Sequence, residues 1–488
     1  MLSTSRIHPL FRFVAVIGIV LSSFASLSAA NGRNADRIKP YAKNAHYWQY
    51  NGKPVMLLGG SNDDNLFQWP SPDLERHLDE MRAVGANYVR NTMSDRRDKG
   101  FELYPFKRLD SGKYDLDQWN DTYWQRFERF LAETAQRDIF VQIEVWDRFD
   151  YSQDNWSGHP YNPRNNINYT AQESTLAAAY PAPAYRNKQP FFFTTPKQRN
   201  IRPVLKYQER FVRKLLSYSL RYGHVLYCMN NETSAEPQWG QHWIELIKTQ
   251  AADQGVTVYA TDMFDDAFDA AKAKHTALIF NNPEHYMFAD ISQVNSRNFN
   301  QAHWDALQWL LRQVDKHPRP SNHTKIYGSG YYTFGTGGPE DGIERFWRNI
   351  LGGSASSRFH RPDGGNGLND WAKASIKAAR ILESLMKFWD ITPQMELLSD
   401  RESNEAYLAA EPGESYALYF TNGGSVGLDL SGAPGAFDVT WISVSMGVTT
   451  RSAANRGWRL TSKTIKGGGV VKLSAPYKGG WVVALVKK

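Results

Sequence analysis

One stretch in the middle of the chain decides the fold: residues 207–250, which read YQERFVRKLLSYSLRYGHVLYCMNNETSAEPQWGQHWIELIKTQ. The spacing of its apolar residues predicts a helix over 207–220, a buried strand over 225–229 and a second helix over 239–250. A strand between two helices is the repeating unit of a parallel sheet, because parallel neighbours need a long crossover connection. The stretch therefore predicts an α/β fold.

The same alternation of strand and helix extends in both directions, from about residue 55 to residue 389. The other predicted strands are 55–59, 87–91, 139–145, 256–260, 288–291, 325–328 and 356–359. Together with 225–229 they make eight strand–helix units, which is typical of a closed (β/α)₈ TIM barrel. After Pro393 the pattern changes to short alternating strands separated by turns such as Gly423-Gly424, and these predict a small all-β sandwich. We expect the barrel at 31–395 and the sandwich at 396–488.

The first thirty residues have the order of a secretory signal peptide. Arg6 and Arg12 precede an apolar run over 13–27, and Ser28 and Ala30 mark a cleavage site. The sequence therefore predicts a secreted or periplasmic protein; an uncleaved anchor is the alternative. No later stretch is long and apolar enough to predict a membrane span.

The amino-acid composition excludes several classes of protein. With 41% hydrophobic and 22% charged residues, the 488-residue chain is neither disordered nor a coiled coil. The single cysteine, Cys228, excludes an intramolecular disulfide and a zinc site built on thiolates. The 16 Trp and 25 Tyr suit stacking on sugar rings as well as a large core. The net charge of +7 suits an acidic polysaccharide, whereas no basic run or motif predicts a nucleic-acid partner.

A carboxylate stands where a TIM barrel carries its chemistry. The fourth predicted strand runs into YCMNNE, so Asn231 and Glu232 follow it directly. Glu232 is expected to act there as a general acid, and Asn231 to hold a hydroxyl of the bound substrate. The alternative is a glutamate that only favours the start of the next helix.

Asn231-Glu232 at this place resembles the acid/base signature of clan A glycoside hydrolases. The stretch NGKPVMLLGG at 51–60 resembles the opening of apiosidase-like barrels of that clan, and 407–430 is similar to the collagen-binding-type β-domain that follows them. The resemblance implies a glycoside hydrolase acting on a plant or algal polysaccharide or oligosaccharide. Nothing in the residues themselves indicates collagen binding.

The end of the seventh predicted strand departs from that pattern. Clan A enzymes carry a nucleophilic glutamate there, but IYGSGYY at 326–332 has no carboxylate. Glu340 is the candidate for a retaining mechanism, unless it only begins the helix at 342–351; Asp147 and Asp262 are candidate bases for an inverting one. Two other classes stay open: a carbohydrate-binding barrel without catalysis, and a polysaccharide lyase acting on a uronate-containing substrate.

Further residues at strand ends are candidates for sugar binding. A buried arginine at such a place orients a carboxylate, pairs with an acidic sugar, or forms a structural ion pair, and an aromatic residue stacks on a sugar or fills the core. The candidates are Arg90, Asn91, Trp146, Tyr331, Arg358 and His360. The glycine-rich stretches lack a phosphate-loop context and no histidines have metal-ligand spacing, so no metal and no cofactor are expected.

Overall fold

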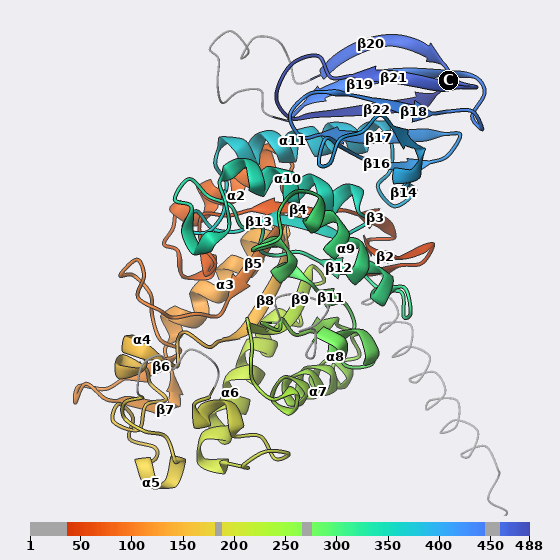
Figure 1. Cartoon of the computed structure of the whole chain (residues 1–488). Helices are drawn as coiled ribbons and strands as arrows, with labels where there is room; N and C mark the ends of the chain where they lie inside the picture. Colours follow the sequence, from red (N-terminus) through yellow and green to blue (C-terminus); the bar gives the residue numbers. More distant parts are fainter. Residues whose placement is uncertain (1–36, 181–187, 266–275, 445–458) are drawn as a thin grey trace, which may run out of the picture.

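The computed structural model describes residues 37–180, 188–265, 276–444 and 459–488 (Figure 1), so the signal peptide expected at 1–30 lies outside the described residues. Eight parallel strands form the barrel. They are β4 (Leu57–Gly60), β5 (Tyr88–Thr92), β8 (Phe140–Asp147), β9 (Val225–Asn231), β10 (Ala260–Thr261), β11 (Ala289–Asp290), β12 (Ser321–Asn322) and β13 (Ser356–Phe359).

Backbone hydrogen bonds close these strands into a ring. Six of them form one sheet in the order β10-β9-β8-β5-β4-β13, and β11 pairs with β12. The amide of Met287 donates to the carbonyl of Ala260 at 2.9 Å, which joins β11 to β10. The amide of Ala355 donates to the carbonyl of Ser321 at 2.9 Å, which joins β13 to β12. The structure therefore confirms the predicted (β/α)₈ barrel.

A helix follows each strand and covers the outside of the ring (Figure 1). The helices are α2 (Asp73–Ala83), α3 (Asp121–Gln136), α6 (Arg202–Ser219), α7 (Pro237–Asp253), α8 (Thr276–Asn281), α9 (Asn300–Val314), α10 (Pro339–Leu351) and α11 (Asp370–Leu385). Each long helix buries one apolar face; in α6, for example, Phe211 and Leu215 lie one turn apart in the core. Short 3₁₀ turns lie between elements: η1 (Leu66–Gln68), η2 (Pro190–Phe193), η3 (Ser292–Asn295), η4 (Thr333–Gly335) and η5 (Met395–Leu397).

A three-stranded meander closes the amino-terminal end of the barrel. Strands β1 (Lys39–Tyr41), β2 (Asn44–Tyr50) and β3 (Lys53–Val55) pair antiparallel. Asn51 and Gly52 join β2 to β3 with φ of 49° and 73°, the left-handed geometry that an Asn-Gly hairpin turn requires. From β2, the buried Trp48 donates its indole N–H to the side chain of Asn322 in β12 at 2.9 Å. The meander is thus hydrogen-bonded to the seventh strand from the amino-terminal end of the barrel.

The connections after β5 and β8 are long and pack together beside the barrel (Figure 1). The first holds the hairpin β6 (Phe106–Arg108) and β7 (Tyr114–Trp119); the second holds α4 (Gln153–Gly158) and α5 (Ala171–Ser174). Their aromatic residues form an apolar cluster in which Tyr151 stacks on Phe191 with 3.8 Å between ring centroids. These connections therefore have a core of their own.

The C-terminal region consists of antiparallel strands, which confirms the predicted all-β region. One sheet has the order β14-β16-β17-β22-β19-β20 and the other β15-β18-β21. Their bounds are β14 (Thr392–Pro393), β15 (Leu398–Ser399), β16 (Ala406–Glu411), β17 (Ser415–Phe420), β18 (Ser425–Asp429), β19 (Ala436–Ser443), β20 (Arg459–Lys466), β21 (Val470–Ser474) and β22 (Trp481–Lys487). The larger sheet packs on α10, where Tyr419 stacks on Trp347 at 5.7 Å. No helix in the described part of the chain is long and apolar enough to cross a bilayer.

Candidate active site

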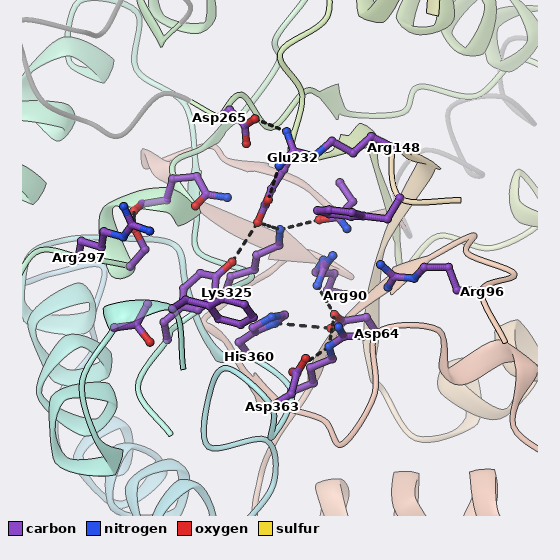
Figure 2. Close-up of a pocket in the computed structure, with 18 residues that line it drawn as sticks. Asp64, Arg90, Arg96, Arg148, Glu232, Asp265, Arg297, Lys325, His360 and Asp363 are labelled. Carbon is purple, nitrogen blue, oxygen red and sulfur yellow. Dashed lines mark hydrogen bonds and ion pairs between the residues drawn. The ribbon is translucent and has the colours of Figure 1, made fainter. Parts of the chain in front are cut away.

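A cavity of about 730 Å³ lies at the carboxyl ends of the barrel strands (Figure 2). Every strand of the ring supplies a lining residue, either from its last positions or from the segment that follows it. In chain order from β4 to β13, these include Asp64, Arg90, Arg148, Asn231, Glu232, Asp265, Arg297, Lys325, Tyr327 and His360. The barrel therefore brings together at one site side chains that are far apart in the sequence.

Glu232 accepts hydrogen bonds from side chains at the ends of other strands (Figure 2). Its Oε1 accepts from Lys325 Nζ at 2.7 Å and from the Tyr327 hydroxyl at 3.0 Å. Its Oε2 accepts from the Arg148 guanidinium at 3.0 Å. The backbone of Glu232 is left-handed, with φ of 54°, an uncommon conformation that persists where surrounding contacts hold it. The carboxylate is thus fixed in place before any substrate binds.

These contacts determine the protonation of Glu232. Burial alone raises the pKa of its carboxyl, but Lys325 and Arg148 outweigh burial and hold the pKa well below its usual value. Glu232 is therefore ionised at neutral pH. An ionised Glu232 suits a nucleophile or a base better than the general acid expected from the sequence, because a general acid must carry a proton. Burial also raises the pKa of Tyr327 well above its usual value, so this hydroxyl keeps its proton and donates it to Glu232 in a hydrogen bond.

A second carboxyl group, Asp265, shares the same arginine. Asp265 accepts from one terminal nitrogen of Arg148 while Glu232 accepts from the other. Burial raises the pKa of Asp265, Arg148 lowers it and the Glu232 charge raises it, and the balance is a raised pKa. Two neighbouring carboxyl groups whose pKa values are pushed apart are the usual sign of an acid and its partner carboxylate.

The opposite wall of the cavity is built around Asp64. Arg90 lies between two buried carboxylates, with 2.7 Å to Asp64 and 2.6 Å to Glu144. Burial opposes the ionisation of Asp64, but the cations Arg90 and Arg361 outweigh it and keep the pKa well below its usual value. Burial is the main cause of the low pKa of His360, which is therefore neutral. Arg90 and His360 thus line the cavity as the sequence predicted, while Arg90 is also committed to two carboxylates.

The three other carboxylates expected to take part in catalysis lie outside the cavity lining. Asp147 is buried, accepts from the amide of Phe149 at 3.0 Å and pairs with Arg96 at 3.4 Å. Asp262 is enclosed by hydrogen bonds from the backbone and side chain of Asn230, and burial raises its pKa to about 7. Glu340 lies in the first turn of α10. The expectation that one of them partners Glu232 is therefore corrected, and the helix-start interpretation of Glu340 holds.

The expected sugar-binding residues divide in the same way. Asn231 lines the cavity and accepts from Lys325 Nζ at 2.5 Å, so it positions the lysine. Asn91 instead accepts from the amide of Phe67, and Trp146 packs among tryptophans of α7 on the helix side of the barrel. Two further candidates also fall outside the lining: Tyr331 is 73% exposed, and Arg358 is fully buried beneath the cavity.

No protein-family model and no curated protein sequence matches the chain. Solved structures do match it. A glycoside hydrolase family 5 structure from Bacteroides vulgatus ATCC 8482 superposes with a TM-score of 0.62 at 13% sequence identity, over 93% of this chain and 94% of its own. Another structure, described as a glycoside hydrolase, gives 0.61 at 13% identity over 93% and 97%. The chain has a glycoside hydrolase fold. The likeness covers both the barrel and the C-terminal β-region.

Within this glycoside hydrolase fold, sequence reasoning missed most of the partners of Glu232. Lys325, Tyr327, Arg148 and Asp265 were not among the expected site residues. One signal was available: the segment at the end of the seventh predicted strand lacks a carboxylate, and the cation Lys325 directly precedes it. Of the long segment after β8, only Arg148 and Phe149 line the cavity among the described residues. In the same described ranges, no group of His, Cys, Asp and Glu is arranged to hold a metal ion.

Proposed function

We propose that this protein is a glycoside hydrolase in which Asp265 protonates the leaving glycosidic oxygen and Glu232 attacks the anomeric carbon. The observation that carries the proposal is the guanidinium of Arg148, which joins an ionised carboxylate to a carboxyl group of raised pKa. Glycosidases pair a charged carboxylate with a carboxyl group that gives up a proton, and a raised pKa favours the second of these roles. The glycoside hydrolase fold supports the proposal, since the pair lies at the end of the barrel that carries chemistry.

The reaction proceeds in two balanced steps. In the first, a Glu232 oxygen forms a bond to the anomeric carbon while the glycosidic C–O bond breaks, and the departing oxygen takes the proton of Asp265. In the second, the ionised Asp265 accepts a proton from water, and the resulting oxygen displaces Glu232. Lys325 and Tyr327 keep Glu232 ionised and oriented throughout. The scheme predicts retention of the anomeric configuration.

An aromatic residue at the cavity supports a saccharide as substrate. Phe334 lines the cavity, yet its side chain is 62% exposed. It belongs to η4, where its backbone is left-handed with φ of 58°. A bulky residue in that conformation is uncommon, and an exposed ring in a cavity wall presents a flat apolar face of the kind that stacks on a sugar ring. We propose a plant or algal polysaccharide or oligosaccharide as substrate, and a secreted or periplasmic location from the pattern at 1–30.

The lyase alternative fits the site less well. A lyase needs a base that removes a proton from the sugar ring, and Tyr327 is the tyrosine of the cavity. Its raised pKa and its hydrogen bond to Glu232 keep it protonated, so it is a donor rather than a base. A carbohydrate-binding barrel without catalysis would have the same cavity, but sugar binding alone does not require the divergent pKa values of Glu232 and Asp265.

Two variants and two kinds of substrate test the proposal. Asp265→Asn should lose about 10²–10⁴-fold in kcat on saccharides, because these need a proton donor. It should keep most activity on 4-nitrophenyl glycosides, because nitrophenolate leaves without protonation. Glu232→Gln should lose activity on both kinds of substrate, and Glu340→Gln, outside the cavity, should keep it. Equal losses of Asp265→Asn on both substrates, or no release of reducing ends from any polysaccharide of a plant and algal panel, would contradict the proposal.

A further inference from the structure

The cavity carries an excess of positive side chains. Six cationic and four acidic side chains line it. The cationic residues are Arg90, Arg96, Arg148, Arg297, Lys325 and Arg361, and the acidic ones are Asp64, Glu232, Asp265 and Asp363. A neutral sugar does not need such a surplus, whereas a cleft lined by charge of one sign concentrates ligands of the opposite sign.

Five of the six cations are committed to a carboxylate. Lys325 and Arg148 contact Glu232, Arg90 and Arg361 contact Asp64, and Arg96 contacts Asp147, all within 3.5 Å. These contacts are internal to the protein, so the charges are largely neutralised without substrate. Five of the lining cations therefore already have a carboxylate partner within the protein, and one cation of the lining does not.

Arg297 is that remaining cation. It follows η3 at the carboxyl end of β11, and among the described residues its guanidinium has no ion-pair or hydrogen-bond partner. The residues on either side are held, since the Ser296 hydroxyl donates to the carbonyl of Gln293 at 2.9 Å and the Asn298 amide to that of Val294 at 3.1 Å. Figure 2 places Arg297 on the opposite side of the cavity from Arg96. A long cationic side chain on a fixed base thus borders the same space as Glu232.

We infer that the substrate is an anionic saccharide and that Arg297 binds its acidic group, a uronate carboxylate or a sulfate ester. This inference rests on the proposed function. The planar guanidinium offers paired N–H donors that match the oxygens of either group. Because the side chain is exposed, binding removes little water from it, and the acidic group neutralises the one lining cation that lacks an internal partner. Phe334 supplies the apolar face beside it.

Matched substrates separate charge from the rest of the sugar. Oligosaccharides of polygalacturonate are compared with their methyl-esterified forms, and a sulfated galactan with its desulfated form. For one of the two pairs, kcat/KM should be at least tenfold higher on the acidic member than on its neutral counterpart. The pair that shows this preference identifies the recognised group as a carboxylate or a sulfate. Equal kcat/KM on the acidic and neutral members of both pairs would overturn the inference.

Arg297→Gln tests the residue. Loss of a hydrogen bond to a charged group should raise KM for the acidic substrate about tenfold or more, with a smaller effect on kcat and none on the neutral member. Arg312→Gln is the matched control, because Arg312 is exposed on α9, does not line the cavity and carries the same charge. An equal rise of KM in both variants would assign the effect to net charge and overturn the role of Arg297.

Calorimetry on Glu232→Gln distinguishes the two proposals. Binding of an acidic oligosaccharide to this variant, without hydrolysis by the wild-type protein, would refute the proposed function and keep the inference. Hydrolysis of neutral saccharides alone would support the proposed function and refute the inference of an anionic substrate.

Discussion

Lys325→Met removes the cation closest to Glu232 while nearly keeping the length of the side chain. The two charges are 2.7 Å apart and the lysine side chain is only 2% exposed. At an effective dielectric constant of about 20, two unit charges at this distance attract by roughly 6 kcal/mol. Arg148 stays in place and water enters the space, so the net effect is smaller. We expect the pKa of Glu232 to rise by about 1–3 units, the usual influence of one neighbouring charge.

The assay is kcat/KM against pH on a 4-nitrophenyl glycoside, for which protonation of the leaving group does not matter. The acidic limb of the profile reports the ionisation of Glu232 in the free protein, and it should move upward in Lys325→Met. Lys325→Arg keeps the charge and should keep the limb. An acidic limb that stays at the same pH in Lys325→Met would refute the electrostatic account of Glu232.

The same pair predicts how folding stability depends on pH. The pKa of Glu232 is lower in the folded state than its usual value of 4.5. Its ionisation therefore contributes stability above that pH, and the contribution is lost as the pH falls below it. In urea unfolding at several pH values, Lys325→Met should lose less stability between pH 5 and pH 3 than the wild-type protein. A steeper acid loss in the variant would contradict the sign of the shift.

Three further predictions follow. Trp347→Ala should lower the free energy of unfolding in urea by about 3–5 kcal/mol, because the buried ring stacks on Tyr419 between the barrel and the β-region; a loss below about 1 kcal/mol would mean that this contact is dispensable. Gly240→Ala should cost about 1–3 kcal/mol in the same assay, because its Cβ would overlap the carboxylate of the buried Asp262, whereas Gly432→Ala meets no neighbour; equal losses in the two variants would contradict this packing. Proton NMR of the first-formed product should show a retained anomer, and an inverted one would exclude Glu232 as nucleophile.

The sequence predicted most of the barrel because its longer strands are apolar. The ranges expected at 55–59, 139–145 and 225–229 overlap β4, β8 and β9, which are rich in apolar residues. The seventh strand was placed too late, since β12 begins at Ser321. Its residues are polar because Asn322 points into a hydrogen-bonded barrel interior, where it contacts Trp48, Tyr88 and Gln142. A pattern that searches for apolar runs cannot detect a strand whose inward face is polar.

The candidate site could be predicted only in part, for a related reason. Glu232 was found because it directly follows an apolar strand, and Arg90 and His360 because they lie at strand ends. Lys325 is 93 positions from Glu232 in sequence, and only closure of the ring places it 2.7 Å away. Side-chain alternation alone cannot show which residues face the cavity: Glu144 and Trp146 are two positions apart in β8, yet Glu144 contacts Arg90 inside the barrel and Trp146 packs against α7 outside.

The lysine on the seventh strand explains why the proposed roles differ from those expected. A carboxylate within hydrogen-bond distance of Glu232 would have raised the pKa of one of the two, because like charges disfavour ionisation, and Glu232 could then have carried the proton. Lys325 has the opposite effect and holds Glu232 ionised. The proton must then come from a carboxyl group that is near Glu232 but shielded less well by cations, and Asp265, which pairs with Arg148 alone among the described residues, meets that condition. In the proposed mechanism, the lysine that follows the seventh strand thus favours a proton donor that follows the fifth, because Glu232 and Asp265 share Arg148.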